Sequence, residues 1–160
     1  MSDQAIKTLV SQGLAAMKAG GKVAEKATAD IQRDARDPDL KAALEEGNRT
    51  STEWKRRMER AIDEIGGIEG IENQILQAHY DVSKEIRAKA EDDQSRDLGI
   101  IAAGQMALHY WIAAFGTMAS YASRVGMTQL AQDMKTSVDE AKQADEAHNK
   151  LAAKIMQKAA

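Results

Sequence analysis

The chain has 160 residues, with 22 Lys and Arg against 25 Asp and Glu, a formal net charge of −3, one proline and no cysteine. The near-even charge disfavours nucleic acid as a partner, because binding it needs a basic surface, and the absence of cysteine excludes disulfides, thiolate metal sites and a cysteine nucleophile. No continuous apolar run approaches the ~20 residues that span a bilayer, and the first residues show no signal-peptide pattern, so we expect a cytoplasmic protein without a membrane partner.

The composition predicts an all-α chain. Alanine fills 29 positions, and most other residues also have high helix propensity. The single proline, Pro38, lies where a helix can begin, with Asp37 before it as the cap. Breaks in the helical pattern divide one domain, 1–160, into five predicted helices near 3–35, 38–65, 69–91, 96–124 and 128–158. The short connections predict antiparallel neighbours.

Glycines mark several of the predicted boundaries. Gly66 and Gly126 suit left-handed caps at the C-termini of helices. The first helix is the weakest, since glycines interrupt it and each costs about 0.5–1 kcal/mol relative to alanine. A kink or a break is therefore predicted near Gly20-Gly21.

The helical spacing of apolar residues predicts which side of each helix is buried. In the third helix, Ile71, Ile75, Ala78, Val82 and Ile86 share one side. The stripe of the second helix is Leu40, Leu44, Gly47, Ser51, Trp54, Met58, Ala61 and Ile65. That of the fourth is Leu98, Ile101, Gln105, Leu108, His109, Ile112, Phe115, Ala119 and Ala122. That of the fifth is Leu130, Met134, Val138, Ala141, Asp145, His148, Ala152 and Ile155. Polar groups lie within the last two stripes, and a functional site is expected there.

The three histidines are distributed one to a helix, as His79, His109 and His148. Asp145 and His148 are three residues apart, so both can point inward from one helix face toward His109. One carboxylate with two imidazoles is adequate for a divalent transition metal. The alternative is that each histidine is a core or boundary residue satisfied by a carbonyl, a hydroxyl or water. A di-metal site in a ferritin-like bundle needs a richer set of glutamates and histidines.

Two aromatic residues, Tyr110 and Trp111, directly follow His109 in the sequence. They cannot face the same side as the imidazole, so at least one of them is predicted to point outward, where it would suit a dimer contact. A further alternative is that the paired glycines and this exposed aromatic pair form a groove for a partner or a small apolar ligand.

Two stretches resemble the YciE/YciF-type ferritin-like family of bacteria. The first, 37–46, has a Pro-acid-Leu-Lys-Ala-Ala run that enters the second helix, and the second, 96–126, is followed by a further match at 139–145. The order and spacing match over about 38–155. The resemblance implies a ferritin-like bundle of four long antiparallel helices with an additional helix, usually dimeric, associated with bacterial stress responses and without a settled activity.

Relatives in this family carry acidic and histidine residues that face the bundle centre in the manner of a di-iron site, and this chain departs from that pattern. His109, Glu140 and Asp145 persist at matched positions, His148 stands where relatives usually carry Leu, and Glu25 could restore one carboxylate. The loss of the others removes negative charge that two iron ions require. The resemblance places the lost ligands at Gly21, Gly47, Thr50, Leu108, Trp111 and Ala141.

Two hypotheses follow. The first is a non-catalytic structural or protein-interaction protein, homodimeric and stress-related, with a degenerate di-iron site and no cofactor. The second is a remodelled site for iron or another divalent metal at His109, Asp145 and His148, with Glu140 or Glu25, that supports oxygen or peroxide chemistry. Nothing in the sequence names a protein partner.

Overall fold

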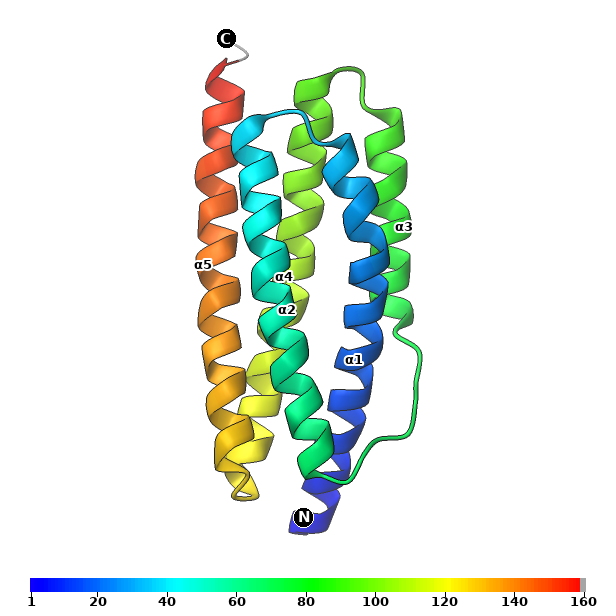
Figure 1. Ribbon diagram of the computed structural model, residues 1–160, viewed down its shortest axis with the longest axis vertical. Helices are drawn as coiled ribbons and strands as arrows, with labels where there is room; N and C mark the ends of the chain where they lie inside the picture. The colour runs from blue at the N-terminus through cyan, green and yellow to red at the C-terminus, as the bar shows by residue number, and fades with distance from the viewer. Residues whose placement is uncertain (159–160) are drawn as a thin grey trace.

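The computed structural model describes residues 1–158, which form five α-helices. Four long helices run alongside one another, and the shorter α3 lies outside them, packed against α1 and α4 (Figure 1). This arrangement confirms the predicted all-α bundle with an additional helix. The helices are α1 (Asp3–Asp34), α2 (Pro38–Glu64), α3 (Gln74–Lys89), α4 (Asp93–Arg124) and α5 (Thr128–Lys158).

The helix boundaries follow local chemistry. The Asp37 carboxylate accepts the first free N–H groups of α2, as predicted, and Gly66 and Gly126 have φ of +82° and +75° after the ends of α2 and α4. Two expectations are wrong. The third helix begins at Gln74 rather than near 69, after an extended connection, and α1 continues through Gly20-Gly21 without a break.

Close packing of α1 against α3 explains why Gly20 lies within a continuous helix. A Cβ atom at Gly20 would lie 2.7 Å from Leu76 Cδ1 and 2.8 Å from Asn73 Nδ2. Asn73 caps α3 through Leu76 and also donates to the Ala16 carbonyl and the Tyr110 hydroxyl. The glycine therefore permits a close approach of the two helices.

The buried apolar residues form two clusters at different heights along the bundle. The larger one is built around Leu14, Trp54, Phe115 and Met134. The smaller one lies toward the α1–α2 turn and contains Ala35, Leu40, Ile100, Ile101, Leu151 and Ile155. The stretch between the two clusters holds most of the polar groups singled out in the sequence, so a functional site is expected there.

The apolar stripe predicted to be buried in the third helix is wrong for this chain taken alone. Ile75 and Val82 are 70% and 56% exposed. Helix α3 instead packs through Leu76, Ser83 and Arg87, and the guanidinium of Arg87 binds the Asp34 carboxylate and the Ser83 hydroxyl. Helical periodicity reports that a face is apolar, and it does not say whether the covering surface belongs to the same chain.

Helix α4 is, within residues 1–158, the one helix long and apolar enough by length and composition to cross a membrane. The core helix of a soluble protein meets the same criterion. Here α4 packs along α5 and also contacts α1 and α3. About a third of the most apolar 18-residue stretch of α4 is buried.

Candidate functional site

Glu140, the predicted ligand on α5, is bound by two side chains of α2. Arg57 donates from Nη1 to Glu140 Oε2 at 2.6 Å and from Nη2 to Oε1 at 2.9 Å. Trp54 Nε1 donates to the same Oε2 at 2.8 Å. The Arg57 hydrogen bonds, reinforced by Trp54, hold the pKa of Glu140 below its ordinary value even though burial opposes this. The carboxylate is therefore the counter-ion of a half-buried arginine.

His109 and Asp145 lie side by side, but at the surface rather than facing the bundle interior. His109 Nε2 lies 3.3 Å from Asp145 Oδ2, and the imidazole is 68% exposed. Gln105 donates from Nε2 to Asp145 Oδ1 at 3.2 Å and to Asn149 Oδ1 at 2.8 Å. The pair is thus part of a polar seam between α4 and α5.

His148 is bound to its own helix. Its Nδ1 lies 2.7 Å from the carbonyl oxygen of Ala144, so this nitrogen carries the proton and donates. The His148 ring packs against Gly104 of α4, which leaves room for it. A Cβ atom at Gly104 would lie 3.4 Å from His148 Nε2. Glu25, the possible replacement carboxylate, is 3.5 Å from the Lys55 ammonium.

The side chains present do not fit a di-iron centre. Within residues 1–158, no group of three or more His, Asp or Glu side chains is placed to hold a metal ion. Aromatic packing fills part of the centre instead: Trp111 stacks on Phe115 with ring centroids 5.3 Å apart, and Trp54 meets Phe115 edge-on at 5.0 Å. A guanidinium beside Glu140 also supplies the positive charge that a metal would bring.

The outward aromatic contact predicted at Tyr110 and Trp111 is wrong. Trp111 is only 6% exposed, and the half-buried Tyr110 hydroxyl accepts a hydrogen bond from Asn73. Both side chains turn inward because α3 covers one side of α4 and the aromatic cluster occupies the other.

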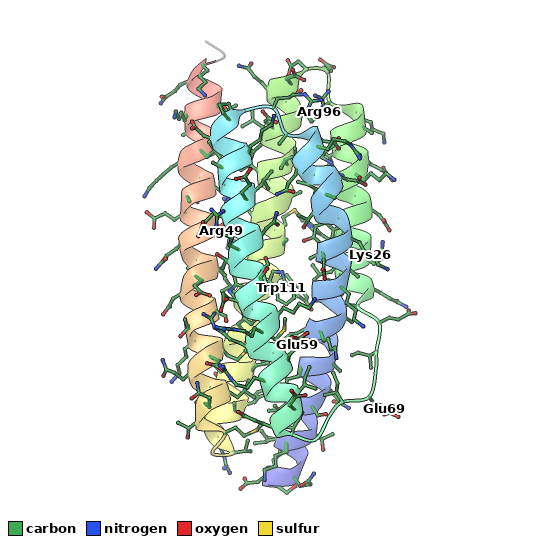
Figure 2. The ribbon with its side chains drawn as sticks, viewed as in Figure 1. Lys26, Arg49, Glu59, Glu69, Arg96 and Trp111 are labelled. Carbon is green, nitrogen blue, oxygen red and sulfur yellow. The ribbon has the colours of Figure 1, made fainter. Side chains whose placement is uncertain are left out.

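A cavity of about 540 Å³ lies between α1 and α2, beside the aromatic cluster. Figure 2 shows Trp111 in the space between these helices. Gly21 lines the cavity, and a Cβ atom there would meet only Met58 Cε, at 3.9 Å. The sequence contained one signal for this feature, the interior Gly21, but the roles of Arg57 and Trp54 needed the tertiary structure.

The fold is a five-helix bundle of the ferritin-like class. Residues 7–160 match the family described as a domain of unknown function, DUF892. The chain belongs to this family.

Three comparisons place the chain among its relatives. It is 35% identical to the protein YciF of Escherichia coli over 63 residues, which cover 39% of this chain and 38% of YciF. The crystal structure of the E. coli stress protein YciF superimposes with a TM-score of 0.90 at 22% identity, covering 96% of this chain and 98% of that one. YcfI of Rhodopseudomonas palustris, described as a candidate structural protein, superimposes with a TM-score of 0.85 at 21% identity, covering 90% and 92% of the two chains. At these identities the superpositions establish the fold.

Proposed function

We propose that this protein is a non-catalytic, cytoplasmic scaffold or protein-interaction member of its family that acts in a stress response. One observation carries the proposal. The Glu140 carboxylate is bound by Arg57 and Trp54, and aromatic packing fills part of the surrounding centre. The name of YciF as a stress protein supports the biological setting.

Elemental analysis tests this proposal. The protein is expressed with added iron, manganese and zinc, purified without chelators and desalted. We expect less than stoichiometric metal, because Arg57 and Glu140 neutralise each other and leave no anionic centre. A stoichiometric metal that survives desalting would contradict the proposal.

The second candidate is the remodelled metal site, and the His109–Asp145 contact is the observation that favours it. For a third ligand, His148 would have to release the Ala144 carbonyl and rotate toward this pair. If the site forms, His109→Ala and His148→Ala each abolish metal binding without loss of helicity. Unchanged binding in both variants rejects it.

We also propose that the protein is a homodimer that joins through the apolar face of α3, here defined as Ile75, Ala78, Val82 and Ile86. All four residues are exposed, although their spacing is that of a buried stripe. An uncharged apolar stripe is complementary to its own copy across a two-fold axis, and exposed apolar faces of this kind mark interfaces. A second copy of the chain is therefore the occupant that this face suits.

A further inference from the structure

The cavity between α1 and α2 has an aromatic floor and a polar rim. Trp54, Met58 and Trp111 line it, and each is at most 6% exposed. Around the mouth lie Thr28, Asn48, Ser51 and Thr52, together with charged residues of both helices. An enclosed apolar base with a few polar groups above it is the usual composition of a small-molecule site.

The size of the cavity suits a ligand of two or three fused rings. Its volume of about 540 Å³ lies inside the range of roughly 300–1,000 Å³ found for small-molecule sites. Indole rings offer both face and edge contacts to a flat aromatic group. Trp54 and Trp111, with centroids 6.1 Å apart and planes tilted by 49°, both line the cavity.

The charges at the mouth favour an anion. The charged residues of the lining are Lys18, Lys22, Lys55, Glu25 and Glu59, and Lys55 is paired with Glu25 at 3.5 Å. Lys18 and Lys22 are one helical turn apart on α1, and neither makes an ion pair with any residue in 1–158. Two like charges at this spacing repel each other, so a single carboxylate between them relieves the repulsion.

We propose that this cavity binds a small planar aromatic carboxylate, with the rings against Trp54 and Trp111 and the carboxylate at Lys18 and Lys22. Gly21 is the residue that opens the site, because any larger side chain there projects toward Met58 and into the cavity. This binding function goes beyond a scaffold role and does not depend on it.

Energy transfer from tryptophan to an anthracenecarboxylate probe tests the proposal. The chain has two tryptophans, and both line this cavity. We expect saturable quenching of their emission by the carboxylate, and about tenfold weaker binding of neutral anthracenemethanol, because the alcohol loses the charge-assisted contact. A second hollow of about 660 Å³ lies beside the start of α1, and variants confined to the lining of the first cavity distinguish binding at the two places.

Two pairs of variants separate this site from general adsorption of an aromatic probe. Gly21→Met fills the cavity and Gly47→Met makes the same change at an exposed α2 position with no neighbour within 4 Å. Lys18→Met with Lys22→Met removes the two cations, and Lys41→Met removes an exposed lysine outside the lining. Circular dichroism checks that each variant stays helical.

We expect Gly21→Met to abolish the quenching and the double lysine variant to weaken carboxylate binding about tenfold while leaving the alcohol unchanged. Both controls should bind as the wild type does. Equal binding by Gly21→Met, or equal affinity for the acid and the alcohol, overturns the proposal. If Gly21→Met does not fold, the lysine pair and its control decide the question.

Discussion

Among single residues, the adjacent glycines of α1 illustrate how context reverses the effect of one substitution. Gly20 faces α3, where a Cβ atom would come within 2.8 Å of two side chains, and Gly21 faces the cavity, where the nearest atom is 3.9 Å away. We expect Gly20→Ala to lower the free energy of unfolding by about 1–3 kcal/mol through overpacking. Gly21→Ala should raise it by about 0.5–1 kcal/mol, since alanine restricts the unfolded chain and suits a helix.

Urea unfolding followed by circular dichroism measures both changes in the free energy of unfolding. Each variant is the control for the other, because the two positions are neighbours in one helix. A loss of stability in Gly21→Ala as large as that in Gly20→Ala would show that the difference in space between the two positions has no energetic effect.

The second prediction at the residue scale concerns the pH dependence of the Arg57–Glu140 pair. The pKa of Glu140 lies below its ordinary value of 4.5 in the folded protein because Arg57 and Trp54 bind the carboxylate. A carboxylate with a depressed pKa stabilises the fold fully above its unfolded pKa, and this contribution disappears as the pH falls through the folded value. Glu140→Gln should therefore cost about 1–3 kcal/mol near neutral pH and progressively less below about pH 4.

Chemical denaturation at several pH values measures this difference between wild type and variant. Glu146→Gln on the same helix is the control, because Glu146 pairs with Lys150 on an exposed surface and such pairs contribute little. A penalty for Glu140→Gln that stays constant down to strongly acidic pH would show that the carboxylate charge is not its origin.

Between elements, one buried carboxylate joins the start of α4 to the turn between α1 and α2. Asp97 is 3% exposed and accepts the N–H of Arg36 at 2.8 Å and that of Asp37 at 2.7 Å. We expect Asp97→Ala to cost about 2–3 kcal/mol, because it leaves backbone donors in a part-buried turn without partners. Thermal unfolding and urea midpoints provide the measurement.

Asp92 provides the comparison for this prediction. Its exposed carboxylate caps α4 through Ser95, within one element, so water can replace it when Asp92→Ala removes the side chain. Asp97→Ala should be the more damaging of the two. The opposite ranking would mean that the link between the turn and α4 adds no stability.

The helices show which kinds of element were predictable. Residues 38–65 were predicted correctly because Asp37, Pro38 and Gly66 mark both ends locally. The start of α3 was placed about five residues too early, since 69–73 continue the same apolar pattern but form an extended connection that ends at the Asn73 cap. Local signals therefore located α2 at both ends, but they missed the Asn73 cap of α3, whose side chain also binds α1 and α4.

Across the whole molecule, the exposed apolar face of α3 predicts an association equilibrium. Val82→Glu places a charge at the middle of this face and should weaken the dimer by at least about tenfold, because the charge would be buried without a partner. Sedimentation velocity over a range of concentrations measures the effect. The wild-type melting temperature should also rise with protein concentration, since binding stabilises the folded state.

Gln77→Glu supplies the matched control, because it adds the same charge at an exposed α3 position outside the apolar face. It should leave the dimer intact. A monomeric wild type, or equal dimerisation of Val82→Glu, would reject the proposed interface and leave the ligand proposal untouched.

The sequence alone determined the helical class and the order and approximate extent of the helices, because propensity, capping and spacing are local properties. It singled out His109 and Asp145, which lie 3.3 Å apart, but it did not show that the imidazole is exposed. Only the tertiary structure decided that Arg57 and Trp54 bind Glu140, that Trp111 turns inward, and that the apolar face of α3 is left uncovered. These outcomes depend on how helices distant in the sequence rotate and approach one another, and periodicity along one helix carries no information about the surface that meets it.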